Sequence, residues 1–446
     1  MTEASADTEG RVGAGPAQAP GPPAAGPHPA AGRPRAGGFA WLWAGESLSL
    51  LGTQVTLLAV PLAAVKTLHA SSLDMGLVSA AGWAPIVVLG LVAGVWADRR
   101  DPWRIMLVGN VSRAVLITAI PVLAALHQLT LVALLISVAA VGIFSAFFDI
   151  SCQTFVPELV DESALATANS RLELSRSVSY LAGPALAGLL VAALSAPTAL
   201  WADALSFAMA ALLLLPTASR SRATARRAAA AAAGEPAALV SSIWPDIRAG
   251  LHFVARHRML RTIVTMAALA NAFIAGAEAL QILYGSRDLG LSAGIIGICV
   301  AGAGGGALLG ATATPAVNKV IGESRTIAAG FLLTLAGVVF LALAPKAGAA
   351  WFFAAAQALF GFSNPLLNAS LVTLRQKITP REILGRVNAS ARVLIMSSLP
   401  LGSLAFGALA DAIGIRSTLL LVSGGLAAVC LLTAGPLLVR PASLTQ

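Results

Sequence analysis

Apolar runs of 18–24 residues recur along this 446-residue chain from residue 39 almost to its end. A helix of that length crosses the roughly 30 Å hydrocarbon core of a bilayer. Twelve such runs can be counted. The first six are Phe39–Leu62, Gly76–Ala97, Ile105–Leu126, Thr130–Phe148, Leu174–Leu194 and Thr198–Leu215. The second six are Ile263–Tyr284, Ala293–Thr314, Thr326–Leu343, Ala349–Leu371, Ala391–Ala410 and Thr418–Leu438.

The composition excludes an ordinary soluble enzyme and a disordered chain. Hydrophobic residues make up 57% of the sequence and charged residues only 11%, whereas a soluble domain carries about 25% charged residues. The three cysteines lie far apart with no CxxC pair, so that we expect them to be small apolar side chains rather than disulfide partners. The sequence therefore predicts an all-α polytopic membrane protein with twelve transmembrane helices.

The twelve runs divide the chain into two bundles of six. Residues 1–38 form a Pro/Ala/Gly tail, which cannot bury enough apolar surface to become ordered. The predicted N-terminal bundle is 39–215 and the C-terminal bundle is 263–439. An Ala/Arg-rich linker, 216–262, joins them, and 440–446 form a short C-terminal tail.

The basic residues predict the orientation in the membrane. Of the 29 Lys and Arg residues, 22 fall on the side that holds both termini, four fall on the other side, and three lie within or beside spans. Because short cytoplasmic loops carry an excess of Lys and Arg, we expect both termini and the linker to be cytoplasmic, in a protein of the cell membrane. This clustering between spans also accounts for the net charge of +9 without a nucleic-acid partner.

The two halves repeat. When the sequence is shifted by 219 residues, three glycines, one leucine and one asparagine of the first half fall on identical residues of the second, and Asp149 falls on Asn368. The identical pairs are Gly142 and Gly361, Leu165 and Leu384, Asn169 and Asn388, Gly183 and Gly402, Gly188 and Gly407. Such repeats are expected in transporters whose site lies between two halves that rock against each other.

Polar residues at helical spacing mark the first, fourth, seventh and tenth spans. In a membrane such residues face protein or a water-filled cavity. They predict a crevice lined by four helices, although small polar residues also serve ordinary helix packing. We expect this lining to include Ser49, Thr53, Thr56, Asn271, Gln281, Gln357, Asn364, Asn368 and Arg113.

Two carboxyl groups within spans are candidates for proton coupling. Glu278 lies well inside the seventh span, where a charged carboxylate costs about 2.5–3.5 kcal/mol on insertion scales. A group that takes up and releases a proton there can couple proton flow to substrate movement. We expect Glu278 to be the main proton-coupling residue and Glu46 the second. The alternative is a structural acid neutralised by Arg113, which itself either pairs with a carboxylate or meets an anionic substrate.

The turn between the second and third spans carries a dense charge pattern. It reads Gly94-Val-Trp-Ala-Asp98-Arg99-Arg100-Asp101-Pro102-Trp103-Arg104. A carboxylate here can accept hydrogen bonds from the N–H groups of a helix N-terminus or from an arginine.

That pattern resembles the loop signature of the major facilitator superfamily. Its form Asp-Arg-x-Asp-x-x-Arg is similar to that of the permeases related to enterobactin exporters and macrolide-efflux proteins. Further resemblances lie at Phe147-Phe148-Asp149, at Gly183-Pro184-Ala-Leu-Ala-Gly188 and at Asp203-Ala-Leu-Ser206-Phe207. Together these resemblances extend over about residues 39–440.

The resemblance implies a gate and a transport direction. Gly94, Asp98, Arg99 and Arg104 would form a cytoplasmic latch with Asp149, made when the crevice opens outward. Gly183, Pro184 and Gly188 correspond to an exporter-type kink. The chain departs from the pattern twice: 310–325 lacks the acid of the loop signature, and Gly52-Thr53-Gln54 lacks an acid after the glycine.

Other function classes find no support in the sequence. The five histidines lie outside the spans without clustering, and GxxxxGK[ST] is absent, so that we expect no metal, no cofactor and no ATP drive. The predicted function is export of small amphipathic molecules, such as drugs, siderophores or secondary metabolites, by proton antiport and alternating access. We expect a monomer in the bilayer. The alternatives are a proton-coupled importer of the same fold and a non-transporting sensor or channel.

Overall fold

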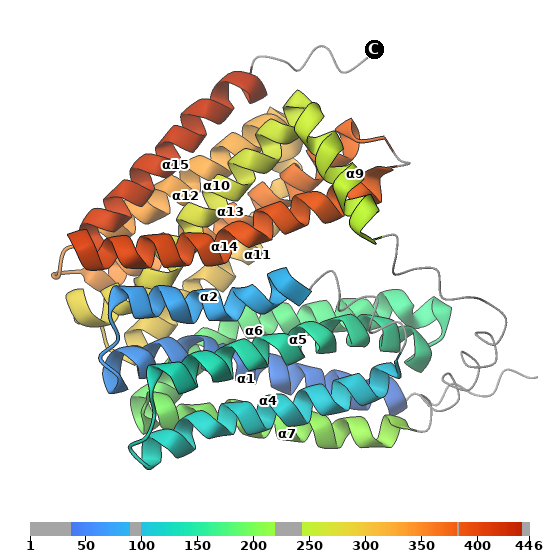
Figure 1. Cartoon of the computed structure of the whole chain (residues 1–446), viewed down its shortest axis with the longest axis vertical. Coiled ribbons are helices and arrows are strands. Elements are labelled where there is room, and N and C mark those ends of the chain that lie inside the picture. Colours follow the sequence, from blue (N-terminus) through green and yellow to red (C-terminus); the bar gives the residue numbers. More distant parts are fainter. Residues whose placement is uncertain (1–36, 90–99, 219–242, 381–382, 439–446) are drawn as a thin grey trace, which may run out of the picture. The chain divides into compact units, whose positions relative to one another are not determined.

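A computed structural model describes residues 37–89, 100–218, 243–380 and 383–438. Within these ranges every regular element is a helix (Figure 1). The predicted tail 1–38 and the middle of the predicted linker lie almost wholly outside the described residues.

Each predicted span corresponds to one long helix, although residues 90–97 of the predicted second span lie outside the described residues. The first-half helices are α1 (Gly37–Thr67), α2 (Ser72–Leu89), α4 (Pro102–Ala125), α5 (Leu131–Leu159), α6 (Leu165–Leu194) and α7 (Ala196–Leu214). The second-half helices are α10 (Arg258–Leu283), α11 (Ala293–Ile321), α12 (Glu323–Ala342), α13 (Ala349–Ile378), α14 (Leu384–Ile413) and α15 (Ile415–Leu438). The all-α fold with six long helices in each half is thus the predicted one.

The remaining elements are short. Two 3₁₀ turns, η1 (Glu162–Ala164) and η2 (Leu215–Thr217), lie beside α6 and α7, and a π-helical turn, η4 (Tyr284–Asp288), extends α10. The part of the predicted linker that the structure describes contains one helix, α9 (Ile243–Arg256). Val254 of α9 is buried against Leu260 of α10 and Val387 of α14, so that α9 is fixed to the second half.

Eleven described helices are long and apolar enough to cross a membrane. The exception among the twelve is α13, a helix of 30 residues. Its hydropathy is lowered by Gln357, Asn364 and Asn368, the residues of the predicted polar stripe. A helix of this kind is tolerated in a membrane where its polar side faces protein or water.

Helix starts follow local sequence. Asp101 precedes α4 and accepts from the backbone N–H of Trp103, with Pro102 at the first helical position. Ser292 precedes α11 and accepts from the N–H of Ile295. Both arrangements satisfy N–H groups that lack a partner in the first turn of a helix. α11 passes into α12 through Gly322, at a φ of 81° that disfavours other residues.

The sequence repeat reappears as a repeat of packing. A Cβ at Gly188 of α6 would lie 2.9 Å from Gly297 Cα of α11, and a Cβ at Gly407 of α14 would lie 3.1 Å from Gly76 Cα of α2. These two contacts join the halves, α6 to α11 and α14 to α2. The positions related by the 219-residue shift therefore occupy equivalent places in the two interfaces between the bundles.

The same equivalence holds within each half. Gly183 of α6 packs on Gln54 of α1, and Gly402 of α14 packs on Ala272 of α10. In both cases a Cβ would overlap the neighbouring helix, because the two backbones approach closely. The repeat noted in the sequence thus specifies close helix contacts.

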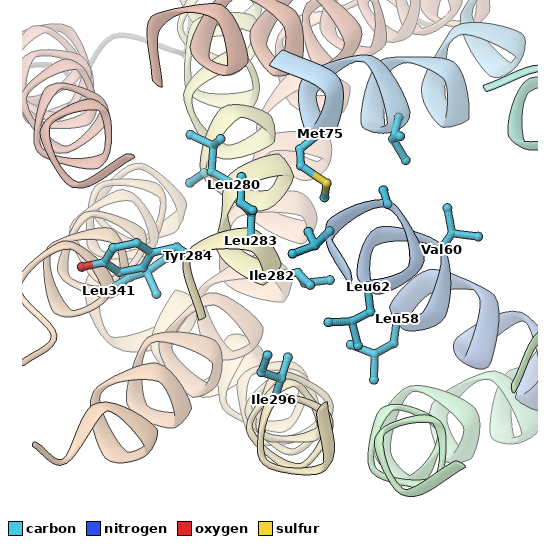
Figure 2. Close-up of a cluster of buried hydrophobic side chains, with 14 of the residues drawn as sticks. Leu58, Val60, Leu62, Met75, Leu280, Ile282, Leu283, Tyr284, Ile296 and Leu341 are labelled. Carbon is cyan, nitrogen blue, oxygen red and sulfur yellow. The ribbon is translucent and has the colours of Figure 1, made fainter. Parts of the chain in front are cut away.

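The halves meet through an apolar cluster where α1 ends and α2 begins, which we call the closed end. Figure 2 shows Leu58 and Leu62 of α1, Met75 of α2 and Leu280 and Ile282 of α10 gathered there. Leu62 and Leu280 have no solvent-exposed surface. This end therefore presents a dry contact between the first and second bundles.

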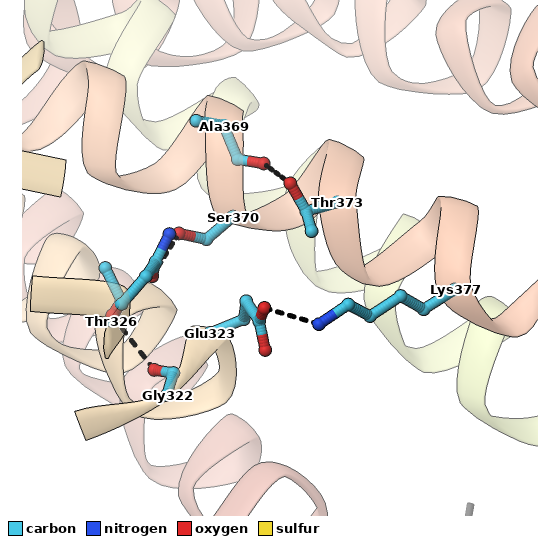
Figure 3. Close-up of polar contacts among 8 residues, drawn as sticks. Gly322, Glu323, Thr326, Ala369, Ser370, Thr373 and Lys377 are labelled. Atoms are coloured by element: carbon cyan, nitrogen blue, oxygen red, sulfur yellow. Dashed lines mark hydrogen bonds and ion pairs between the residues drawn. The ribbon is translucent and has the colours of Figure 1, made fainter. Parts of the chain in front are cut away.

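At the opposite end, polar contacts join helices of the second half to one another. Figure 3 shows an ion pair between Lys377 of α13 and Glu323 at the start of α12. The distance from Nζ of Lys377 to Oε1 of Glu323 is 2.6 Å. Ser370 of α13, fully buried, donates a hydrogen bond of 3.0 Å to Oδ1 of Asn318 on α11. These contacts fix α11, α12 and α13 as a unit.

Candidate functional site

Arg113 lies in the interior of the first bundle, midway along α4. Only 5% of its surface is exposed. Its Nη2 donates to Oδ1 of Asn110 at 2.5 Å and its Nε donates to the carbonyl of Gly109. The guanidinium lies between two rings, 4.2 Å from the centroid of Phe148 on α5 and 4.4 Å from that of Phe207 on α7. Cation–π contacts with two rings are typical of arginine.

Three carboxyl groups interact with this guanidinium at longer range. Glu46 on α1, Asp149 on α5 and Asp203 on α7 each interact electrostatically with Arg113. None of their oxygens lies within 4.0 Å of its nitrogens, among the ion pairs of the described residues. Glu46 is buried, and its Oε2 has no hydrogen-bond partner. The arrangement is a shared charge cluster, with one arginine at its centre, rather than one ion pair.

Asp203 is the member that sequence reasoning missed as a site residue. Its carboxylate accepts hydrogen bonds from the hydroxyls of Thr56 on α1 and Ser206 on α7. Gly52 permits this approach, because a Cβ there would overlap Asp203 and Ser206. The available signal was an acid inside the apolar run Thr198–Leu215, the same signal that singled out Glu278.

The polar residues that share one face of α1, namely Glu46, Ser49, Thr53 and Thr56, are partly buried. Glu46 and Ser49 have 7% and 4% of their surfaces exposed, so that both lie within the packed first half. Thr53 and Thr56 keep some accessible surface. The stripe therefore runs from a buried charge cluster to a partly accessible surface.

The second half contributes accessible polar groups. Glu278 on α10 and Asn364 and Asn368 on α13 are exposed. Nδ2 of Asn368 donates to Oδ1 of Asn364 at 2.9 Å. Asn271 and Gln281 are partly exposed, and Gln357 is buried. The amide oxygens of Gln281 and Gln357 have no hydrogen-bond partner.

Glu278 lies in the last third of α10. It precedes Ile282 by four residues, which places both on one side of α10. Ile282 belongs to the apolar cluster shared with Leu58 and Leu62 of α1 (Figure 2). Among the described residues no Lys, Arg or His nitrogen lies within 4.0 Å of the Glu278 carboxylate. The side chain is exposed although it lies within a membrane helix.

The predicted latch stays a prediction. Gly94, Asp98 and Arg99 lie outside the described residues. Nε of Arg104 lies 3.4 Å from Asp101 Oδ2 in its own helix turn, and the structure does not bring it to Asp149. Asp149 is exposed and interacts electrostatically with Arg113 and Arg176.

The Gly-Pro element lies in the interface between the bundles. α6 runs without a break through Gly183, Pro184 and Gly188, all of which are buried. A Cβ at Gly297 would overlap the Pro184 carbonyl oxygen. Pro184 and Gly188 thus form part of the contact between α6 and α11, whereas Gly183 packs on Gln54 of α1, and a kink specific to exporters stays a prediction.

Comparisons with known proteins point to transport. The multidrug efflux pump Tap of Mycolicibacterium fortuitum is 26% identical over 86% of this chain and 91% of its own length. Macrolide efflux protein A of Streptococcus pyogenes is 22% identical over 90% of this chain and 95% of its own length. Both alignments cover most of this chain.

The fold and the family agree with these relatives. The crystal structure of a bacterial homologue of the iron transporter ferroportin, in an inward-facing state, superposes with a TM-score of 0.68 at 16% identity, over 90% of this chain and 98% of the other. Residues 33–441 match the family described as transmembrane secretion effector. The protein is a multi-pass membrane transporter of small molecules and not an enzyme; it belongs to the transmembrane secretion effector family of the major facilitator superfamily.

Proposed function

We propose that this transporter exports small amphipathic molecules from the cytoplasm by proton antiport and alternating access. The observation that carries the proposal is Glu278, an exposed carboxyl group in the last third of α10 with no cationic partner among the described residues. The names of two relatives as efflux proteins support the direction. An importer of the same fold and a non-transporting sensor are the alternatives that the test below distinguishes.

Glu278 is the proposed main proton carrier. A charged carboxylate without a counter-ion is costly inside a membrane. Binding of a proton removes that cost, and a position facing a water-filled crevice would allow the proton to leave again. The proton bound at Glu278 would therefore change the charge presented to a substrate in the crevice.

Glu46 is the proposed second carrier. It shares Arg113 with Asp149 and Asp203, so that three carboxyl groups interact with one guanidinium. Full ionisation of all three would leave excess negative charge in a region of low dielectric constant, which is unfavourable. The Oε2 of Glu46 that lacks a partner is available for a proton.

The proposed substrate surface combines amides with apolar groups. Asn271, Gln281, Asn364 and Asn368 supply hydrogen-bonding groups from α10 and α13, and Thr53 supplies a hydroxyl from α1. A few polar groups on an otherwise apolar surface suit amphipathic ligands. Small amphipathic drugs, siderophores and secondary metabolites have this chemistry.

The proposed orientation makes this state inward-facing. With both termini in the cytoplasm, as the Lys and Arg distribution predicts, the end at which α1 ends and α2 begins is extracellular. That end is closed by the apolar cluster (Figure 2). Asp98, Arg99 and Arg104 would then act on the cytoplasmic side, as the gate that is made when the crevice faces outward.

The test is flux into proteoliposomes with an imposed pH gradient. The probes are a lipophilic fluorescent cation and a macrolide, and transport is measured for the intact chain and for Glu278→Gln. We expect the wild type to move a probe against the direction of proton flow. Glu278→Gln should lose gradient-driven transport and retain exchange of probe across the membrane.

Asp288→Asn is the matched control, because Asp288 is exposed at the end of the π-helical turn that follows α10. It should transport as the wild type does. Wild-type rates in Glu278→Gln would exclude the proposed carrier. Probe movement in the same direction as protons would indicate an importer, and gradient-independent behaviour of the wild type would indicate a sensor.

A further inference from the structure

The last turn of α14 and the first turn of α2 are joined by one carboxylate. Oδ1 of Asp411 accepts from the backbone N–H of Ser72 at 2.8 Å, and its Oδ2 accepts from the N–H of Leu73 at 3.2 Å. The hydroxyls of Ser71 and Ser72 also donate to this carboxylate. Because α2 belongs to the first bundle and α14 to the second, Asp411 caps a helix of the opposite half.

The α2 helix has a cap of its own. The N–H of Ser71 donates to Oδ2 of Asp74 at 2.8 Å, and the N–H of Asp74 donates to Oγ of Ser71 at 3.2 Å. This reciprocal pair is a capping box. The start of α2 is therefore satisfied from within its own half, and the bonds to Asp411 add a connection between the halves.

The contacts beneath Asp411 are tight and uncharged. A Cβ at Gly407 would lie 2.8 Å from the Ser72 carbonyl oxygen. The hydroxyls of Ser79 and Ser403 lie 2.9 Å apart across the same interface. Further in, Met75 is 2% exposed within the apolar cluster of Figure 2. Asp411 thus adds a charge-assisted contact at the outer edge of an interface that has to separate if this end opens.

Charge makes this contact favourable, and exposure makes it reversible. The first turn of a helix carries a partial positive charge that attracts an anion, and hydrogen bonds to an ionised acceptor are stronger than neutral ones. Asp411 is nevertheless exposed. When the halves separate, water can replace its α2 partners, so that the bonds can break and reform in each cycle.

We propose that Asp411 is a gate-positioning residue that holds the closed end shut and sets the ratio of the closed to the open state there. This inference rests on the alternating access of the proposed function. It assigns to Asp411 no contact with substrate or proton. Its effect is on the conformational equilibrium, which can be measured without transport.

The experiment measures reactivity of a cysteine behind the gate. Met75→Cys is introduced into the full chain with Cys152, Cys299 and Cys430 replaced by serine. The labelling rate with a membrane-impermeant maleimide is measured in vesicles of both orientations. We expect Asp411→Ala to increase this rate by about tenfold from the side of the closed end, because the stabilising bonds to Ser72 and Leu73 are lost.

Two control variants separate the gate from general effects. Asp161→Ala removes an exposed acid that makes no side-chain cap bond, and should leave the rate unchanged. Asp74→Ala weakens the cap of α2 within its own half, and should change the rate much less than Asp411→Ala. Equal acceleration by Asp74→Ala would mean that fraying of α2, rather than the contact between halves, controls access, and would overturn the proposal.

A conservative variant covers the case in which Asp411→Ala does not fold. Asp411→Asn keeps the shape of the side chain and loses its charge, and should increase the rate by roughly threefold. Unchanged rates in the folded variants would reject the gate role. Accelerated labelling in a protein that moves no probe in liposomes would retain the gate and reject the proposed export.

Discussion

The carboxylate of Asp203 on α7 accepts a hydrogen bond from the hydroxyl of Thr56 on α1. Asp203 is 1% exposed, and its other hydroxyl partner, Ser206, lies on its own helix. Thr56 is therefore the side chain through which α1 supplies a donor to this buried acid. The bond connects a helix of the predicted crevice to the charge cluster around Arg113.

Removal of the Thr56 hydroxyl should destabilise the first bundle. In Thr56→Val the buried Asp203 carboxylate loses a donor, and we expect the free energy of unfolding to fall by about 1–3 kcal/mol. Thermal unfolding of the purified protein in detergent measures the change. Thr312→Val is the matched control, because the exposed Thr312 hydroxyl bonds only to carbonyls of its own helix. A shift of equal size in both variants would contradict the prediction.

The charge cluster should show strong coupling between Arg113 and Glu46. Arg113→Leu leaves the surrounding carboxyl groups without their central positive charge. By analogy with removal of one partner of a buried pair, it should cost about 3–5 kcal/mol of unfolding free energy. Glu46→Gln should cost less. In the double variant part of the loss should be recovered, with a coupling energy of about 0.5–3 kcal/mol; additive losses in thermal unfolding would show that the two residues act independently.

Replacement of two adjacent glycines of α11 by alanine should have different effects on the contact between α6 and α11. A Cβ at Gly304 would lie 2.5 Å from the Tyr180 carbonyl oxygen, whereas a Cβ at Gly305 would have Leu181 Cδ1 as its nearest neighbour, at 3.8 Å. Gly304→Ala should therefore slow transport at least several-fold and lower thermal stability. Gly305→Ala should leave the transport rate unchanged and keep or slightly raise thermal stability, because alanine is more favourable than glycine in a helix by about 1 kcal/mol. Similar behaviour of the two variants would argue against tight packing at this interface.

Two polar contacts of α13 should differ in their contribution to stability (Figure 3). The ion pair between Lys377 and Glu323 is solvent-accessible, with 55% and 28% of the side chains exposed. Lys377→Met should cost less than about 1 kcal/mol, and the cost should vanish in high salt. Ser370→Ala removes a buried donor to Asn318 and should cost about 1–3 kcal/mol at any salt concentration. Chemical or thermal unfolding at two ionic strengths checks both; a salt-sensitive Ser370 variant would contradict this division.

The sequence alone was sufficient for the fold class and for the repeat. Hydrocarbon imposes a helix length and a composition on every membrane segment, so that the twelve apolar runs identify the membrane helices. Gly188 and Gly407 were paired from spacing alone, and the structure places both in the contacts between the bundles. The predicted helix ends were less accurate than the predicted helices. α13 continues to Ile378, past the predicted Leu371, and α14 begins at Leu384, before the predicted Ala391. Helices extend past the apolar core wherever their next turns remain hydrogen-bonded.

Only the tertiary structure decided which polar groups share an environment. Periodicity placed Glu46 and Thr56 on one face of one helix, but it could not show that Arg113 lies between Phe148 and Phe207 or that Asp203 meets Thr56. It likewise could not show that Asp411 caps a helix more than 300 residues earlier in the chain. Burial of apolar runs is a local property that each segment of the sequence specifies for itself. Partnership between charges depends on how separate helices pack, and that packing exists only once the bundles have formed.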